Sequence, residues 1–188
     1  GVGIDGDGCS DSCALDPSDP AVTECDNVTA GAPTTVALGA TVFVSGSTVN
    51  GLSQHNGSCQ LTPTPPDGYS KENIIKVRPT AIGTMTLTLG EDMSEVPACG
   101  ADTSMEPPFP FPDGCWDRSM YVRATCDLPA TELFCADSPS PYWAVETITI
   151  PVAVANTDYY VFIDGWLDYV ALGDQSDVGS YDLKIELQ

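Results

Sequence analysis

The chain has 188 residues, enough for one domain with a full core, and its 27 acidic against 6 basic residues give a formal net charge of −21. This charge excludes a protein that follows nucleic-acid phosphates, because such binding needs clustered cations. A membrane-spanning helix is excluded as well, since no stretch is apolar over about 20 residues. Repulsion among the carboxylates predicts that divalent cations or a saline medium offset the charge, although simple solubility is an alternative explanation.

Residues 1–24 are predicted to form an acidic tail that binds Ca²⁺. The Gly-rich run Gly3–Cys13 suits a loop that folds carboxylates around a hard cation, with candidate ligands Asp5, Asp7 and Asp11. The run resembles the calcium-binding repeat of thrombospondin type 3, whose acidic positions these three residues match. Gly3 and Ala14 stand at two further acidic positions of the repeat, so a neighbour would have to supply ligands. A flexible acidic linker is the alternative interpretation.

From residue 25 to residue 188 the composition becomes that of a β protein, and one domain is predicted. β-Branched residues recur in short runs broken by Gly, Pro, Asn and Asp, and no window sustains a helical period. Strands are predicted within Thr34–Val44, Asn73–Arg78, Thr84–Leu89, Met120–Ala124, Thr131–Phe134, Val145–Val154, Asp158–Gly165 and Tyr181–Leu187. The expected fold is all-β, a two-sheet antiparallel β-sandwich of jelly-roll type with an extended N-terminal tail.

The last two runs are the clearest strands and are predicted to pair with each other. Asp158–Gly165 is apolar on both faces, whereas Tyr181–Leu187 alternates strictly between apolar and charged residues. The acidic loop between them, Trp166–Ser180, is longer than a tight turn, and such loops are usually functional or ordered by metal. A second cation site is therefore predicted, with ligands Asp164, Asp168, Asp174 and Asp177. A solvated loop whose aspartates only begin turns is the alternative.

Eight cysteines form an even set, which indicates disulfides made in an oxidising compartment. They are Cys9, Cys13, Cys25, Cys59, Cys99, Cys115, Cys126 and Cys135. The lack of a CxxC motif and the presence of a single histidine argue against a structural zinc site. Spacing alone leaves about 105 pairings open, and the preferred one is sequential: 9–13, 25–59, 99–115 and 126–135. The chain is expected to be a mature exported product, secreted or held at the cell surface.

Five segments of the second half together resemble the bacterial pre-peptidase C-terminal (PPC) domain. They read MYVRATC, ELFCAD, TITIPV, DYYVFIDG and GSYDLKIEL. The resemblance extends less specifically to Cys25 and Cys59. It implies a calcium-tolerant, non-catalytic β-sandwich that serves as an appendage or surface module, and it supports a disulfide between Cys126 and Cys135. A Pro-rich insertion at residues 94–117 departs from the family pattern.

Two binding functions are predicted, because the motifs of catalysis are absent. The only histidine, His55, is expected to be a surface residue of a polar loop, and no G-x-S-x-G motif occurs. The first function is a structural or adhesive module that self-associates into a homo-oligomer or filament, through its tail or through a strand added to an exposed sheet edge. The alternative is a carbohydrate-binding or targeting accessory module of a secreted enzyme, with stacking candidates Trp116, Tyr142, Trp143, Trp166 and Tyr169.

Two sequons for N-linked glycosylation suit an exported glycoprotein. They begin at Asn27 and Asn56 and are predicted to lie in turns. Such triplets also arise by chance, so both asparagines are candidates for modification.

Overall fold

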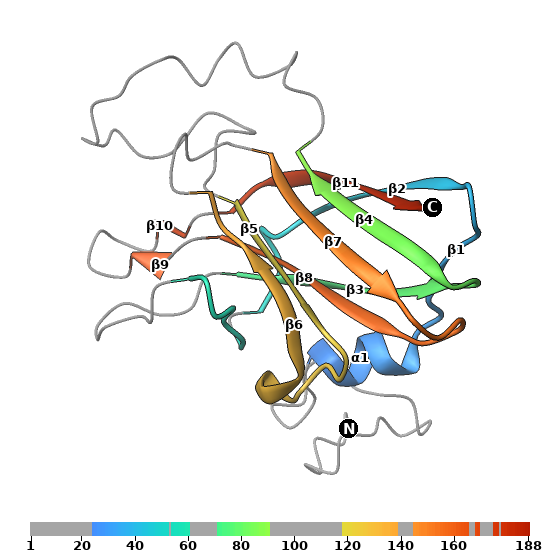
Figure 1. The fold of residues 1–188 in the computed structure, drawn as a ribbon. Coiled ribbons are helices and arrows are strands. Elements are labelled where there is room, and N and C mark those ends of the chain that lie inside the picture. The colour runs from blue at the N-terminus through green and yellow to red at the C-terminus, as the bar shows by residue number, and fades with distance from the viewer. Residues whose placement is uncertain are drawn as a thin grey trace, which may run out of the picture.

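The computed structural model describes residues 24–52, 54–60, 71–90, 118–138, 145–165 and 178–188, with the backbone of short strands β9 (Asp168–Tyr169) and β10 (Gln175–Ser176). Two sheets pack face to face, and the short helix α1 (Glu24–Ala30) lies against the outer face of the larger sheet (Figure 1). The predicted two-sheet β-sandwich is confirmed. No helix among the described residues is long and apolar enough to cross a bilayer.

The larger sheet has five strands in the order β1-β3-β8-β5-β6. These are β1 (Thr34–Val36), β3 (Asn73–Pro79), β8 (Tyr159–Gly165), β5 (Arg118–Arg123) and β6 (Glu132–Ala136). All neighbours run antiparallel except β1 and β3, which are parallel and thus depart from the predicted purely antiparallel arrangement. Strand β8 is central and every one of its residues is buried, which explains why its sequence is apolar on both faces.

The smaller sheet has four antiparallel strands in the order β2-β11-β4-β7. These are β2 (Thr41–Ser47), β11 (Ser180–Leu187), β4 (Gly83–Leu89) and β7 (Glu146–Val152). Its inner face buries aliphatic residues such as Leu87, Ile148 and Ile185 against the larger sheet. Its outer face carries Thr86, Thr149 and Glu186 in register, so the alternation read in these strands separates core from exterior.

The predicted pairing of the last two long strands is wrong, because β8 and β11 belong to different sheets. A strand that is apolar on both faces needs cover on both sides, and the five-stranded sheet provides it through the sandwich core and α1. Strand β11 has one charged face and fits only a sheet with one polar exterior. The segment between them therefore connects the two sheets and does not close a hairpin.

Two local predictions also differ from the structure. The alternating run at residues 34–44 forms two strands in different sheets, because the chain turns between them at Gly39, whose φ is +76°. Helix α1 was not predicted, since seven residues are too few to display a helical period. Asn27 consequently lies in a helix rather than in a turn.

The disulfides join Cys25 to Cys126 and Cys59 to Cys135, so the predicted pairs 25–59 and 126–135 are wrong. The register of β5 with β6 gives the reason. Cys135 lies opposite Tyr121, whereas Cys126 follows the end of the ladder and packs against α1. Each bridge thus ties an N-terminal segment to the β5–β6 hairpin. The other four cysteines, the insertion at 94–117 and the tail before Glu24 lie outside the described residues.

Candidate functional site

A second layer of side chains covers the outer face of the five-stranded sheet. Four buried residues of β3, β5 and β8 point outward there: Ile74, Tyr121, Tyr160 and Phe162. Helix α1 packs on them through Cys25 and Val28, and the loop at residues 54–60 lies beside it. This layer also encloses several polar and charged side chains, among them Glu72, Gln60 and Arg123. We call it the outer cluster, meaning α1, residues 54–60 and the outward-facing residues beneath them.

His55 occupies the centre of the outer cluster. Its Nδ1 lies 2.5 Å from Oε1 of Glu72, a carboxylate with no exposure to solvent. The hydroxyl of Tyr121 donates to the other oxygen of Glu72 at 3.1 Å. The His55 ring stands edge-on to Phe162 with 5.2 Å between the ring centroids, and only 11% of its side chain is exposed. The prediction that His55 is a surface residue is therefore wrong.

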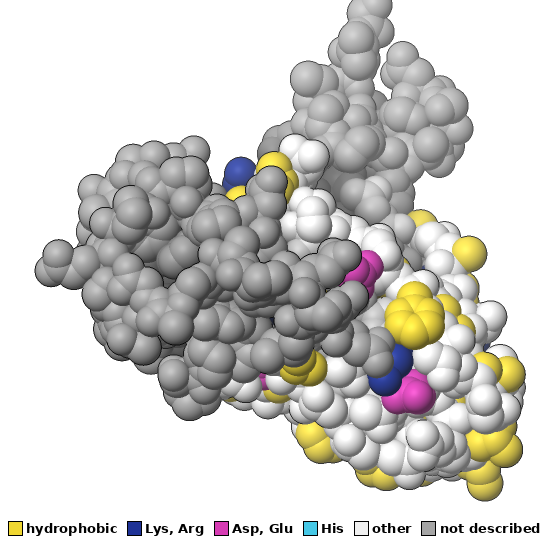
Figure 2. All heavy atoms as spheres, turned by 90° about the horizontal axis from the view of Figure 1, so that it is seen from above, with side chains coloured by type: hydrophobic (Ala, Val, Ile, Leu, Met, Phe, Trp, Pro, Cys, Tyr) yellow, Lys and Arg dark blue, Asp and Glu magenta, His cyan; other side chains and the backbone are white. Residues whose placement is uncertain are grey.

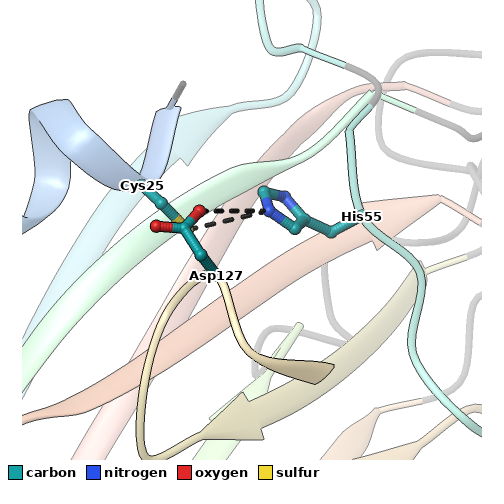
Figure 3. A group of neighbouring side chains, drawn as sticks. All are labelled: Cys25, His55 and Asp127. Atoms are coloured by element: carbon teal, nitrogen blue, oxygen red, sulfur yellow. Dashed lines mark hydrogen bonds and ion pairs between the residues drawn. The ribbon is translucent and has the colours of Figure 1, made fainter. Parts of the chain in front are cut away.

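The second nitrogen of His55 faces a sulfur atom and a carboxylate. Its Nε2 lies 3.7 Å from Sγ of Cys25 and 3.8 Å from Oδ1 of Asp127 (Figure 3). The three groups come from α1, the loop at 54–60 and the turn after β5, and their ligand atoms lie within 4.8 Å of one another. In the disulfide-bonded protein Cys25 has no thiolate to offer, so a metal ion would find only the imidazole and the carboxylate here.

Glu24 anchors the start of α1 to the rest of the cluster. Its carboxylate accepts hydrogen bonds from the backbone N–H groups of Leu52, at 3.5 Å, and Ile74, at 3.3 Å. Burial, together with the nearby charge of Glu72, raises the pKa of Glu24 from 4.5 to about 7. The carboxyl group therefore changes its charge near neutral pH.

Arg123 closes the outer cluster on the side of β5. Its guanidinium lies 4.7 Å from the ring centroid of Phe162 and 5.0 Å from that of Tyr121, and the two rings stack on each other. It donates to the backbone carbonyls of Cys126 and Asn56. The loop carrying His55 is thus held to the sheet by a buried cation, which explains how one of only six basic residues is used.

Gln60 fixes the other end of the same loop. Its side-chain oxygen accepts from the N–H of Gly57 at 2.6 Å, and its nitrogen donates to Ser119 and to the carbonyl of Gly165. A Cβ atom at Gly57 would lie 2.6 Å from the Tyr121 ring, so only glycine allows this close approach. These contacts hold the loop that carries His55 against the sheet.

Among the described residues, the atom nearest the second nitrogen of His55 is a disulfide sulfur. A His–carboxylate pair needs an adjacent nucleophile, and the candidate next to His55 is a sulfur already bonded to Cys126. The described residues thus form a β-sandwich whose buried polar groups brace a loop. The two disulfides indicate an oxidising, extracytoplasmic compartment.

The predicted calcium ligands are only partly described. Asp164 is fully buried on β8 and is paired in register with Ser119 of β5. Asp168 belongs to β9, of which only the backbone is described. The remaining candidates lie outside the described residues: Asp5, Asp7, Asp11, Asp174 and Asp177. Both calcium sites stay predictions.

The structure does not describe the side chains of the sugar-stacking candidates either. Tyr169 lies on β9, described by backbone alone, and the others lie outside the described residues: Trp116, Tyr142, Trp143 and Trp166. Of the two sequon asparagines, Asn27 is exposed on α1, and Asn56 is half-buried with its carbonyl engaged by Arg123. Glycosylation at both stays a prediction.

A second feature of the structure is an edge strand of the smaller sheet. Among the described residues, β2 pairs with β11 on one side and with no strand on the other. Phe43, near its middle, is 64% exposed. Seen from above the view of Figure 1, the described surface carries several hydrophobic side chains and few charged ones (Figure 2). Sequence reasoning predicted strand addition to an exposed edge, but the alternating pattern alone did not identify which strand would be that edge.

Comparison with known proteins gives only distant structural likeness. No protein-family model matches the chain, and no curated protein matches it. The chain is similar to the periplasmic inhibitor of g-type lysozyme PliG from Aeromonas hydrophila, at 13% identity and a TM-score of 0.41 over 82% of this chain and 96% of that one. It is also similar to the pre-peptidase C-terminal domain of collagenase from Bacillus anthracis, at 6% identity and a TM-score of 0.40 over 83% and 98%. Membership of the PPC family stays a prediction.

Proposed function

We propose that this protein is a non-catalytic, extracellular structural module that self-associates by pairing β2 with the β2 of a second copy. The free edge of β2 is the observation that supports this function. It presents seven residues, TVFVSGS, without a charge, a proline or an irregularity in its register with β11. Natural sheets usually protect such edges with charged residues, prolines, bulges or short length.

The other sheet edges have that protection. Strand β7 contains Pro151, β6 begins at the half-buried Glu132, and β1 has only three residues. Proline removes a backbone donor, and a charge next to a partner strand must be desolvated. Strand β2 is therefore the edge best suited to accept another strand.

The hydrogen bonds at both ends of β2 define which groups face outward. Thr48 N–H donates to the carbonyl of Gly179, and Leu187 N–H donates to that of Ala40. Because bonded and non-bonded pairs alternate along an antiparallel ladder, Val42, Val44 and Gly46 bond to β11. The residues that alternate with these point their backbone N–H and C=O groups away from β11: Thr41, Phe43 and Ser45.

Charge limits where two copies of this chain can meet. Two molecules of charge −21 repel each other over most of their surface, and an uncharged strand is where their backbones can approach at least cost. An antiparallel pair of β2 strands is isologous, which is the commonest dimer symmetry. It would extend the four-stranded sheet across the two subunits and bury Phe43 of both.

Calcium is proposed to act with this contact. The carboxylates of Asp5, Asp7 and Asp11, and of the acidic loop that follows β8, would bind Ca²⁺ and lower the repulsion between subunits. What supports this part of the proposal is the charge and the spacing of the aspartates. An excess of chelator is then expected to shift the oligomer toward monomer and to lower the melting temperature. Physiological salt without Ca²⁺ is expected to restore the oligomer and the melting temperature only in part.

Sedimentation velocity of the Phe43→Pro variant tests the contact. Proline at this position deletes an outward N–H and the exposed ring without removing a bond to β11, so the fold is expected to persist while the dimer is lost. Phe43→Thr is the matched control, because it removes the ring and keeps the N–H. It is expected to weaken the dimer less than proline does. If the proline variant associates as tightly as the wild type, β2 is not the interface.

A further inference from the structure

The disulfide Cys25–Cys126 lies in a chemical environment that the second disulfide lacks. The only histidine of the chain points its Nε2 at the Cys25 sulfur, and the carboxylate of Asp127, the residue after Cys126, lies beside that sulfur on the same side of the ring (Figure 3). The Cys25 sulfur, the imidazole and the carboxylate thus place their ligand atoms within 4.8 Å of one another, and the sulfur of Cys126 is next to the first of them. In the oxidised protein the two sulfurs are bonded to each other.

The separations between these groups match tetrahedral coordination. With Zn–S of about 2.3 Å and Zn–N of about 2.0–2.1 Å, a tetrahedral site holds its sulfur and nitrogen ligands about 3.6 Å apart. Cys25 Sγ and His55 Nε2 are 3.7 Å apart. The same geometry requires about 3.4 Å between nitrogen and oxygen ligands, and the distance from His55 Nε2 to Asp127 Oδ1 is 3.8 Å. Asp127 is 58% exposed, so it can close this gap by a small rotation.

The surroundings of His55 supply an independent indication. A carboxylate oxygen accepts, so Nδ1 is the nitrogen that donates to Glu72, and Nε2 is left as the ring nitrogen that faces Cys25 and Asp127. Histidines that bind metals commonly donate their other ring N–H to such a carboxylate, which fixes the tautomer. Glu72 is fully buried and is itself held by the Tyr121 hydroxyl. Glu72 and Tyr121 thus hold the imidazole with its second nitrogen toward Cys25 and Asp127.

We propose that opening the Cys25–Cys126 disulfide converts this cluster into a Zn²⁺ site with the ligands Cys25, Cys126, His55 and Asp127. A dithiol breaks the S–S bond by supplying two electrons and two protons and becomes a disulfide. A phosphine does the same with water, which supplies the two protons and the oxygen of the phosphine oxide. Both cysteine sulfurs become thiols. Binding of Zn²⁺ then releases the two thiol protons to solvent. Two thiolates and an imidazole favour zinc over the hard cation calcium, which takes oxygen ligands.

The site would keep α1 attached to the turn after β5 in both redox states. A covalent bridge holds these elements in the oxidised protein, and a metal bridge replaces it in the reduced protein. The second disulfide offers no such replacement. Cys59 N–H donates to Sγ of Cys135 at 3.0 Å, and the only histidine is engaged elsewhere. The two bridges therefore form a matched pair for an experiment.

Zinc binding by single-cysteine variants tests the proposal without reducing the protein. Cys126→Ser frees the Cys25 thiol beside His55 and Asp127 and leaves the other disulfide intact. Cys135→Ser frees the Cys59 thiol, which has no histidine. Isothermal titration with Zn²⁺ is expected to show one site per chain in Cys126→Ser beyond any binding by the oxidised wild type, and no additional site in Cys135→Ser.

Two further variants separate a built site from adventitious thiol binding. Adding His55→Gln to Cys126→Ser is expected to abolish the additional site, and adding Glu72→Gln to weaken it by about 10–100-fold, the usual cost of losing a carboxylate that orients a metal-bound histidine. Circular dichroism verifies that each variant is folded. Equal zinc binding by Cys126→Ser and Cys135→Ser, or binding that is indifferent to His55, would overturn the proposal. So would the absence of zinc uptake by folded Cys126→Ser.

Discussion

At the scale of single residues, the outer cluster gathers charged side chains that are buried or half-buried: Glu24, Glu72 and Arg123. A chain with 27 acidic residues places two of them close together in this cluster: Glu24, half-buried at the start of α1, and Glu72, fully buried beneath the helix. The energetic cost is offset by specific donors: His55 and Tyr121 for Glu72, and two backbone N–H groups for Glu24. Such a cluster makes the stability of the fold depend on pH.

The Glu24→Gln variant tests this dependence. Because the pKa of Glu24 is about 7 in the folded protein and about 4.5 when unfolded, the folded state binds the proton more tightly. This group therefore lowers the free energy of unfolding as pH rises from about 4.5 to about 7. The glutamine variant is expected to lose less stability than the wild type across this interval.

Urea unfolding at several pH values measures the difference. Asp137, whose pKa burial and the charge of Glu146 raise to about 6, contributes in the same direction to both proteins and cancels in the comparison. The Arg78 guanidinium holds the pKa of Asp158 below its usual range, so that pair acts at lower pH. Parallel stability curves for wild type and Glu24→Gln would contradict the account of this carboxyl group.

At the scale of secondary-structure elements, the two disulfides connect α1 and the loop at residues 54–60 to the sandwich. Their loops span 101 and 76 residues, and α1 has only seven residues of its own. A helix of this length is not stable alone, so its position depends on the bridge and on packing over Ile74 and Phe162.

Removal of each bridge by paired Cys→Ala substitutions is expected to be costly. The chain-entropy account gives about 4.5 kcal/mol for loops of this size, and measured losses are about 2–5 kcal/mol. The Cys25/Cys126 variant is expected to lose amide protection in α1, whereas the Cys59/Cys135 variant is expected to lose it at residues 54–60. Hydrogen exchange read by residue distinguishes the two. Identical exchange patterns in both variants would contradict separate roles for the bridges.

The strands show which features of the fold can be predicted from the sequence. Alternation in Thr84–Leu89 and Tyr181–Leu187 depends on one buried and one exposed face, and those strands occur where predicted. Which strands become neighbours depends on contacts far apart in the chain, and the predicted pairing of the last two strands was wrong. The cysteine pairing failed for the same reason, since it follows from the β5–β6 register. The burial of His55 could not be predicted from the sequence. Its partner Glu72 is 17 residues away, and only the fold brings the two side chains together.

At the scale of the whole molecule, charge governs how copies can meet. A net charge of −21 acts against compactness and association alike, and salt screens it beyond a Debye length of about 8 Å. The composition alone predicts this constraint. It could not locate the uncharged edge of β2, because the run at residues 34–44 splits into strands of two different sheets.

The proposed contact gives a simple relation between fold and function. The larger sheet is covered on its outer face by α1 and the His55 loop. Strand β2 ends the smaller sheet and, among the described residues, pairs with no strand beyond its outward-facing residues Thr41, Phe43 and Ser45. One side of the sandwich thus serves stability, and the opposite edge is available for association. Assembly would proceed by backbone hydrogen bonds, which tolerate the high charge of the surrounding surface better than a broad interface does.

Residue-resolved amide exchange of the wild-type protein, in dilute and in concentrated solution, tests this account most directly. The amides of Val42, Val44 and Gly46 bond to β11 and are expected to be protected at both concentrations. Those of Thr41, Phe43 and Ser45 point away from β11 and are expected to exchange freely in the dilute protein and to become protected as it associates. Rapid exchange of these three amides in a sample shown by sedimentation to be oligomeric would contradict pairing through β2.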